Sequence, residues 1–278
     1  MRLLKKIRRN TGGGIMSGEK KLVLQASDIS IVFGGLCAVS DASFDLYEGE
    51  LIGLIGPNGA GKTTMFNMVS GIYTPTSGQM SYWDTEDKVR IINKANPAQL
   101  NRLGIARTFQ NIRLFGNLTV LDNVRIALHN SRISRPADVI FRTARFRRDE
   151  QIMTEKVMQL LSLFKIDGKS GELAKNLPYG EQRKLEIVRA LASNPKLLLL
   201  DEPAAGMNPQ ETHELMNMIA FIRKEFNLTI LLIEHDMKLV MGICERIMVL
   251  NYGRIIASGS PDEIKSNPQV IKAYLGGE

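Results

Sequence analysis

The segment GPNGAGKTT, residues 56–64, constrains the fold of this chain more than any other feature. It matches the pattern G-x-x-x-x-G-K-[ST] from Gly56 to Thr63 without a mismatch, and it stands between the apolar run LIGLI and a helix-forming segment. Glycines let such a loop curl until successive backbone N–H groups face one anion, and the positive end of the next helix adds to the attraction. The sequence therefore predicts an α/β fold that holds phosphate in a strand–helix turn, the P-loop.

The P-loop pattern also assigns chemical roles. Lys62 is expected to reach the β- and γ-phosphates of a nucleoside triphosphate, and the hydroxyl of Thr63 is expected to bind Mg²⁺. A glycine-rich loop that binds no phosphate is the alternative, and the complete pattern in its strand–helix context disfavours it. We expect a site for a nucleoside triphosphate and Mg²⁺ that involves Gly56, Pro57, Asn58, Gly59, Ala60, Gly61, Lys62, Thr63 and Thr64.

An acidic pair ends a second apolar run, LLLLDE at residues 197–202. Four successive leucines are typical of a strand buried on both faces, and the carboxyl end of such a strand is where open α/β sheets bind ligands. In P-loop NTPases an Asp at this place supplies a second contact to Mg²⁺, so we assign that role to Asp201. Glu202 is then the candidate to activate the attacking water, which favours a hydrolase. For this stretch alone, a strand that ends in a solvated acidic turn is the alternative.

Length and composition bound the class of protein. With 278 residues, 44% hydrophobic and 23% charged, the chain fits one large α/β domain or two unequal lobes. Its net charge of +7 falls to +2 without the five Lys and Arg of the first ten residues, which is weak evidence for nucleic-acid binding. Cys37 and Cys244 show no metal-binding or disulfide spacing. No apolar run approaches the roughly 18 residues that span a bilayer, and no signal peptide is evident, so we expect a cytoplasmic chain that can still dock on a membrane protein.

The chain is expected to begin with a basic flexible tail, residues 1–20, in which TGGG forms a joint. Alternatives for the tail are an amphipathic turn that touches anionic lipid and an extension from a start codon upstream of Met16. From about residue 85 to 190 the sequence is charged and helical in character, and it includes the Arg-rich segment 131–150. This region predicts a helical subdomain inserted at about 100–190.

The remaining segments alternate between strand and helix patterns. Strands are expected at 22–33, 42–49, 51–56, 197–201, 229–236 and 245–256, and helices from about 61, at 210–225 and within 262–278. In the helix at 210–225, a core-facing side is predicted by the spacing of Leu215, Met218, Ile219 and Ile222.

Together these segments resemble the ATP-binding subunits of ABC transporters over residues 22–277. The motifs that carry the resemblance, besides GPNGAGKTT and LLLLDEP, are TFQNIRLF at 108–115 (Q-loop), LPYGEQRKLEIVRAL at 177–191 (signature), AAGMN at 204–208 (D-loop) and LLIEHD at 231–236 (switch). The resemblance implies an ABC ATPase fold in residues 21–278: a P-loop NTPase core with a mixed sheet, an antiparallel β subdomain and an inserted α-helical subdomain.

The resemblance also implies further site residues. Gln110 would sense Mg²⁺ and the attacking water, His235 would lie near the γ-phosphate, and Phe33 would stack on adenine. The position of His235 after an apolar run places it at the same sheet edge as Asp201 and Glu202. Taken alone, Phe33 would more often be a core residue and Gln110 an unremarkable polar one.

In this family the signature segment completes the ATP site of a second subunit, so catalysis would require a dimer. Tyr179, Gly180 and Glu181 are the residues that would contact that ATP, since Gly180 lets backbone approach phosphate and a helix begins near Glu181. Two residues depart from the family pattern: Pro178 replaces the usual serine, and Tyr179 replaces the first glycine. Pro178 has no hydroxyl or N–H to give a phosphate. The D-loop carries Asn208 where the family often has Asp.

A narrower resemblance is to the ATPases of high-affinity branched-chain amino-acid importers. The matching segments are FGGLCAVSD, RTFQNIRLF, the tyrosine-bearing signature, LDEPAAGMNPQET, TILLIEHDMKLVMGI and NPQVIKAYLG. It implies as partners a second, similar ATPase, two transmembrane permease subunits and, indirectly, a solute-binding protein, with no nucleic acid. It also implies a peripheral location on the cytoplasmic face of the inner membrane.

Other functions stay open at this point. Urea or amide importers and lipopolysaccharide exporters share much of the pattern. A soluble ABC-type ATPase, such as a cluster-assembly or chromosome-maintenance protein, is another alternative. A DNA-repair member would place a long coiled coil in the interval of about 115 residues between P-loop and signature, where no sustained heptads occur. A translation-factor member would carry two ATPase cassettes, and this chain has one P-loop pattern. A nucleotide-binding regulator without hydrolysis is disfavoured by Glu202.

Overall fold

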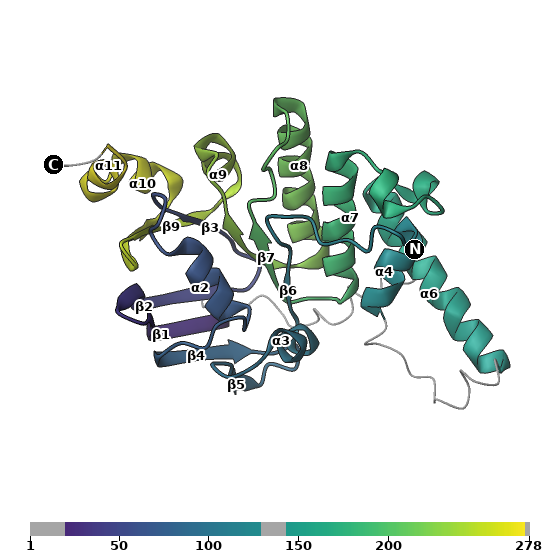
Figure 1. Cartoon of the computed structure of the whole chain (residues 1–278), viewed down its shortest axis with the longest axis horizontal. Coiled ribbons are helices and arrows are strands. Elements are labelled where there is room, and N and C mark those ends of the chain that lie inside the picture. Colours follow the sequence, from purple (N-terminus) through teal and green to yellow (C-terminus); the bar gives the residue numbers. More distant parts are fainter. Residues whose placement is uncertain (1–19, 129–142, 276–278) are drawn as a thin grey trace.

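The computed structural model describes residues 20–128 and 143–275. Nearly all of the expected basic tail and most of the Arg-rich segment 131–150 lie outside these residues. The described residues form two β-sheets with helices packed between and around them (Figure 1).

The first sheet is antiparallel and has four strands in the order β2-β1-β4-β5. Each strand pairs antiparallel with its neighbour. The strands are β1 (Leu22–Phe33), β2 (Leu36–Tyr47), β4 (Ser77–Trp83) and β5 (Val89–Ile91). This sheet confirms the antiparallel β subdomain that the sequence implies.

The second sheet has six strands in the order β10-β9-β3-β8-β7-β6. Only β9 and β10 pair antiparallel, so the sheet is mixed, as expected. The strands are β3 (Leu51–Ile55), β6 (Ile105–Arg107), β7 (Leu197–Asp201), β8 (Thr229–Ile233), β9 (Arg246–Asn251) and β10 (Arg254–Gly259). The register pairs both Leu54 and Asp201 with Ile233, so the carboxyl ends of β3, β7 and β8 meet at one edge of the sheet.

The leucine run of β7 is buried on both faces of this sheet. Leu198 and Leu200 belong to an apolar cluster with the helices of one face, whereas Leu197 and Leu199 belong to a second cluster shared with the antiparallel sheet. Side chains alternate along a strand, so a continuous apolar run fills two cores at once. β3 and β8 are buried throughout in the same way.

Helices separate and cover the sheets. α2 (Lys62–Val69) packs between the two sheets, and α8 (Pro209–Phe226) and α9 (Met237–Ile243) cover the opposite face of the mixed sheet (Figure 1). As its spacing predicts, α8 buries Leu215, Ile219 and Ile222. The other helices are α3 (Pro97–Leu103), α4 (Val120–Ala127), α6 (Ala144–Leu163), α7 (Tyr179–Ala192), α10 (Pro261–Ser266) and α11 (Pro268–Leu275), with short 3-10 turns at Asp167–Lys169 and Ala174–Asn176.

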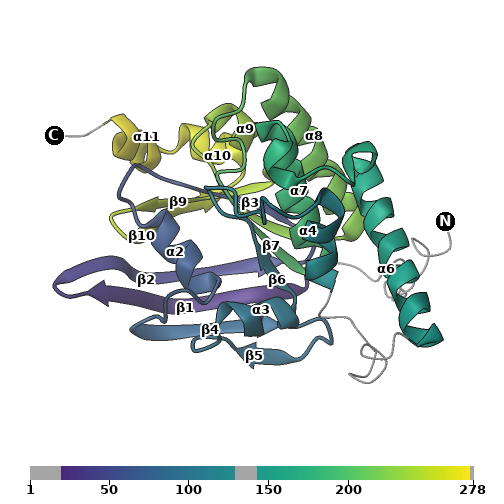
Figure 2. The ribbon, with the colours of Figure 1, turned by 45° about the vertical axis from the view of Figure 1, so that its right-hand side comes forward.

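The helices α4, α6 and α7 lie side by side, away from the β1–β2 hairpin (Figures 1 and 2). The expectation of helical structure from about residue 85 onward is wrong at its start, because the strands β5 and β6 lie on either side of the helix α3 there. The strand β6 has three residues and is too short to show a period in the sequence. It is a strand because it pairs with β7, where Ile105 lies opposite Leu197.

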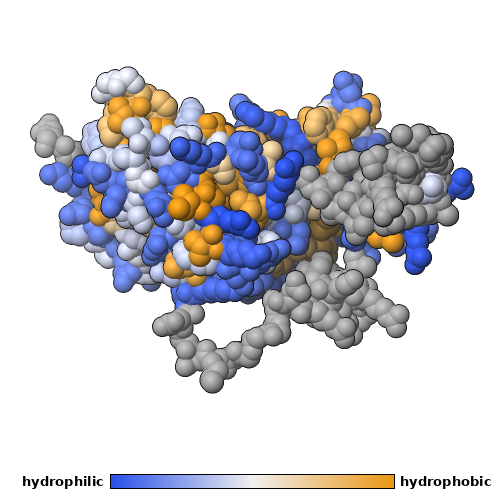
Figure 3. All heavy atoms as spheres, turned by 90° about the horizontal axis from the view of Figure 1, so that it is seen from below, coloured by the Kyte–Doolittle hydropathy of each residue, from blue (hydrophilic) through white to orange (hydrophobic). Residues whose placement is uncertain are grey.

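No helix among residues 20–128 and 143–275 is long and apolar enough to cross a bilayer. The face seen in Figure 3 is mostly hydrophilic, with separate apolar groups between the polar ones.

Candidate nucleotide site

The P-loop turns from the carboxyl end of β3 into α2. Two of its glycines have no room for a side chain: a Cβ on Gly56 would lie 2.0 Å from Leu250 O, and one on Gly61 would lie 2.5 Å from Ala38 O. Gly61 also has φ +102°, in the region that glycine alone adopts freely. The loop is therefore fixed by its backbone, with α2 beginning at Lys62.

Lys62 is held inside the loop. Its Nζ donates to Gly56 O at 2.7 Å and to Pro57 O at 2.9 Å. Burial lowers the pKa of Lys62, whereas the nearby charge of Glu202 acts to raise it. Two carbonyl oxygens of the loop therefore accept hydrogen bonds from the ammonium group of Lys62, which in a P-loop is expected to bind phosphate.

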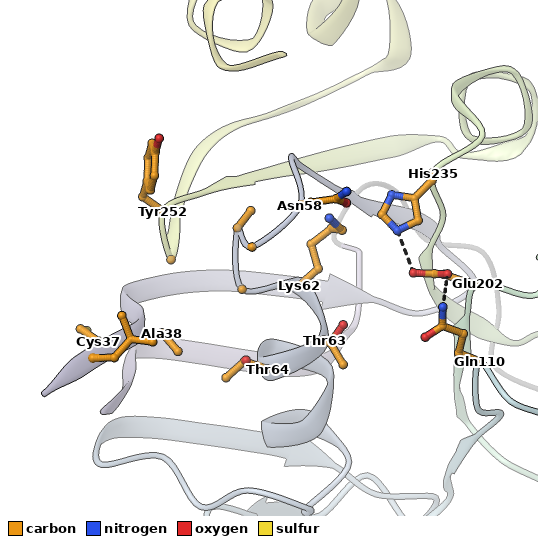
Figure 4. Close-up of a pocket in the computed structure, with 15 residues that line it drawn as sticks. Cys37, Ala38, Asn58, Lys62, Thr63, Thr64, Gln110, Glu202, His235 and Tyr252 are labelled. Carbon is orange, nitrogen blue, oxygen red and sulfur yellow. Dashed lines mark hydrogen bonds and ion pairs between the residues drawn. The ribbon is translucent and has the colours of Figure 1, made fainter. Parts of the chain in front are cut away.

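An open cavity of about 610 Å³ adjoins the P-loop, which is a size typical of small-ligand sites. Figure 4 shows its wall, to which the P-loop, the Q-loop, the ends of β7 and β8 and the turns at β2 and β9 contribute. The lining residues are Leu36, Cys37, Ala38, Asn58, Gly59, Ala60, Gly61, Lys62, Thr63, Thr64, Gln110, Glu202, His235, Tyr252 and Gly253.

The expected catalytic residues come together around Glu202 (Figure 4). Glu202 Oε1 lies 2.7 Å from His235 Nε2, and Glu202 Oε2 accepts a hydrogen bond from Gln110 Nε2 at 2.7 Å. Glu202 has φ +45°, an uncommon conformation for a non-glycine residue, and its N–H donates to Ile233 O at 2.9 Å. Both carboxylate oxygens are therefore oriented by residues from two other segments of the chain.

Asp201 is buried and carries a partner that the sequence did not predict. Arg107 Nη2 donates to Asp201 Oδ2 at 2.6 Å, while Nη1 donates to Asn67 on α2 and to Ser70 just after the end of α2. The guanidinium also lies over the ring of Phe109, 5.0 Å from its centroid. Arg107 thus ties the strand before the Q-loop to the acidic pair and to the P-loop helix. Its signal in the sequence is a lone Arg at the end of an apolar segment, which carries little information by itself.

The residues present fit a magnesium ion. Mg²⁺ prefers oxygen ligands, and the Thr63 hydroxyl and the Gln110 amide both line the cavity. The NH₂ group of Gln110 faces Glu202, which leaves its oxygen for other contacts. Asp201 does not line the cavity, and Arg107 occupies one of its two oxygens.

Glu234 is a second residue that the sequence did not single out. It is 5% exposed, and its carboxylate accepts hydrogen bonds from the N–H groups of Ala204 at 2.7 Å and His235 at 3.1 Å. Burial raises the pKa of Glu234 despite these bonds. Its side chain joins the D-loop to the switch segment.

Phe33 does not line the cavity. It lies at the end of β1, 43% exposed, and packs edge-on against Tyr73 with ring centroids 5.2 Å apart. Leu36 and Tyr252 are the exposed apolar side chains of the cavity wall. Stacking of Phe33 on adenine therefore stays a prediction.

The signature residues lie in the first turn of α7 and do not line the cavity. Tyr179 is 44% exposed, which leaves its ring open to a partner. Glu181 forms an ion pair with Lys169 at 2.7 Å, so its carboxylate is occupied within the same chain. Pro178 precedes the helix without a side-chain cap, and Asn208 caps α8 through Gln210 N and Glu211 N.

A P-loop after β3, an acidic pair at the end of β7, two strands away in the same sheet, and a glutamate held by Gln and His define a P-loop nucleotide hydrolase. A family model described as ABC transporter matches residues 39–205, and one described as branched-chain amino acid ATP-binding cassette transporter matches residues 254–278. The chain belongs to the ABC transporter family of ATP-binding proteins, and it is an ATPase.

Curated relatives match along nearly the whole chain. The high-affinity branched-chain amino acid transport ATP-binding protein LivG of Salmonella typhimurium is 44% identical over 91% of this chain and 98% of its own length. BraF of Pseudomonas aeruginosa, described in the same words, is 43% identical with the same coverage. The lipopolysaccharide export system ATP-binding protein LptB of Haemophilus influenzae is 34% identical over 91% of this chain and 97% of its own.

Solved structures agree with the fold. The ADP conformation of MJ1267, an ATP-binding cassette of an ABC transporter, has a TM-score of 0.77 and 30% identity, and covers 92% of this chain and 99% of that chain. A nucleotide-free ATP-binding cassette from an ABC transporter has a TM-score of 0.77 and 32% identity, with 92% and 100% coverage.

Proposed function

We propose that this chain is the ATPase subunit that energises a membrane importer of branched-chain amino acids. The observation that carries the proposal is that one chain joins a P-loop and the contacts of Glu202 with His235 and Gln110 to a match with LivG and BraF over 91% of its length. The C-terminal segment 254–278 also matches the branched-chain amino acid family model. The match to LptB makes lipopolysaccharide export the second candidate, and the C-terminal segment favours the amino-acid importer.

The proposed reaction is hydrolysis of ATP at the P-loop. Lys62 leaves the carbonyl oxygens of Gly56 and Pro57 and binds the β- and γ-phosphates. When bound, Mg²⁺ would neutralise phosphate charge, and Thr63 and Gln110 would hold it. Asp201, which lies outside the cavity wall, would contribute directly or through a water.

Glu202 is the proposed general base. It accepts the proton of a water molecule that attacks the γ-phosphate in line with the leaving oxygen. His235 and Gln110 fix the two oxygens of its carboxylate, so the base does not have to be oriented during the reaction.

The proposed partners are a second ATPase subunit and two permease subunits, with a solute-binding protein acting from outside. The exposed ring of Tyr179, which does not line the cavity of its own chain, supports a role for the start of α7 at the ATP of a second subunit. We place the chain on the cytoplasmic face of the membrane, attached through the permeases.

Uptake of labelled leucine, isoleucine and valine tests the proposal. A strain that lacks the gene is complemented with the wild type, with Glu202→Gln or with an empty vector. We expect uptake to be restored by the wild type alone. Unchanged uptake of all three amino acids in the deletion strain contradicts the proposal, and a defect in outer-membrane lipopolysaccharide instead would favour the second candidate.

A further inference from the structure

Arg183, in the second turn of α7, is the largest fully buried side chain among the described residues. A buried guanidinium is stable only if its charge and its donors find partners. The charge is paired with Glu186, one turn along α7, at 2.8 Å. The other donors reach out of the helix, to a different segment of the chain.

Those donors bind the backbone of the Q-loop. Arg183 Nη1 donates to Phe109 O and Nη2 donates to Gln110 O, both at 2.7 Å. Glu186 Oε1 accepts from the N–H of Arg113 at 3.2 Å, so the pair contacts the same loop a third time. Two diverging N–H groups on one rigid plane suit two successive carbonyls, and a lysine offers no such fork.

Gln110 connects this contact to the catalytic glutamate. Its carbonyl oxygen is held by Arg183, and its side chain donates to Glu202 Oε2 at 2.7 Å. A shift of α7 therefore moves the backbone of the residue that orients Glu202. Arg183 also contacts the start of α7: its Nη2 lies 3.4 Å from the hydroxyl of Tyr179, whose ring is exposed.

The pair is poorly suited to a role in stability alone. Arg183 Nε is buried and has no hydrogen-bond partner, and an unpaired buried donor costs free energy. A buried ion pair can often be replaced by apolar side chains of similar volume without loss of stability. An apolar pair cannot, however, donate the hydrogen bonds that Arg183 forms with the neighbouring carbonyl groups of Phe109 and Gln110.

We propose that Arg183 is a positioning residue for ATP hydrolysis, which ties the start of α7 to the backbone of Gln110 and thereby sets the orientation of Glu202. This inference rests on the proposed role of Glu202 as the base. Arg183 would then connect the signature segment to Glu202 of the same chain. A partner that contacts Tyr179 would change the rate of ATP hydrolysis through Arg183.

The test compares Arg183→Lys with Arg246→Lys in the full chain, assembled with its partner subunits. Arg246 is a matched control, since it also pairs with a buried carboxylate, Glu50, and donates to a backbone carbonyl, Asp45 O, but contacts neither Gln110 nor Glu202. We expect Arg183→Lys to bind ATP within about twofold of the wild type and to lose kcat by about tenfold or more, because the lost interaction orients a reacting group. Arg246→Lys should keep the wild-type kcat.

A double-mutant cycle with Gln110→Ala separates positioning from general damage. In Gln110→Ala the hydrogen bond from the Gln110 side chain to Glu202 is lost, so Arg183 can no longer influence Glu202 through it. Arg183→Lys should therefore lower kcat little further in that background. Full additivity of the two losses, or a wild-type kcat in folded Arg183→Lys, overturns the inference. If Arg183→Lys does not fold, the double variant Arg183→Met/Glu186→Leu, which leaves no unpaired buried charge, replaces it with the same expected outcomes.

These results separate the inference from the proposed function. A wild type that hydrolyses ATP but supports no amino-acid uptake refutes the importer and leaves the role of Arg183 to the kcat measurements. An unchanged kcat in both arginine variants removes the role of Arg183 and leaves the importer intact.

Discussion

Replacement of Glu202 by glutamine separates ATP binding from ATP hydrolysis in this chain. The two oxygens of Glu202 each face a donor at 2.7 Å, from His235 and from Gln110. Glutamine keeps one of these oxygens, and its NH₂ group can face Gln110 after rotation of that amide, or His235 in its other tautomer. The change therefore costs at most about one hydrogen bond, about 1 kcal/mol of folding free energy, and leaves the P-loop untouched.

The effect on the reaction should be much larger. A positioned general base contributes roughly 10²- to 10⁴-fold to a rate, which corresponds to about 3–5 kcal/mol of barrier. We expect Glu202→Gln to bind a fluorescent ATP analogue as the wild type does, and to release phosphate slower by that factor. Glu86→Gln is the control, since Glu86 is an exposed carboxylate that pairs with Lys88. Phosphate release at the wild-type rate by a folded, ATP-binding Glu202→Gln chain would refute the role of Glu202 as base.

Three further predictions concern other parts of the site. Gly61→Ala should abolish ATP binding and lower the free energy of unfolding by about 1–3 kcal/mol. The reason is that the Cβ of the new alanine would meet Ala38 O at 2.5 Å and that φ at this position is +102°. Measurements of ATP affinity and of urea unfolding test this prediction. Burial raises the pKa of Glu234 in the folded chain, so the wild type should lose stability as pH rises above about 4.5, the value of an ordinary glutamate. Glu234→Gln has no such group, so its melting temperature should rise relative to that of the wild type over the same pH range. A difference in melting temperature that is constant with pH would contradict this prediction. Iodoacetamide should modify the exposed Cys37 faster than Cys244, because burial raises the pKa of Cys244 to about 12. Cys37 lines the cavity, so ATP should slow its reaction, and mass spectrometry follows both thiols.

The sequence alone predicts the P-loop because all its parts are neighbours in the chain. The strand, the glycine-rich turn, Lys62 and Thr63 lie within residues 51–64, and their geometry follows from local rules. The region between about residues 85 and 107 was predicted less well, because β5 and β6 have three residues each and β6 forms by pairing with the distant strand β7. There the charged sequence pattern favoured helix, and tertiary contacts decided otherwise.

The supporting residues of the site were also beyond the sequence pattern. Arg107 and its partner Asp201 are 94 positions apart, Glu234 and its partner Ala204 are 30 apart, and Arg183 and Gln110 are 73 apart. Buried polar groups are placed by whichever partners the fold brings to them, and no spacing in one sequence records those pairs. The fold likewise decided that Tyr252 lines the cavity and that Phe33 does not.

By itself, the sequence determined the phosphate-binding turn, the acidic pair after the buried leucine strand and the class of chemistry, because local backbone geometry and residue type suffice for these. Only the tertiary structure decided how Gln110 and His235 meet at Glu202, and how Arg183 reaches the Q-loop from α7. The physical reason is that the orientation of a carboxylate depends on hydrogen bonds shorter than 3 Å between distant segments, and those distances exist only once the sheet and helices are packed.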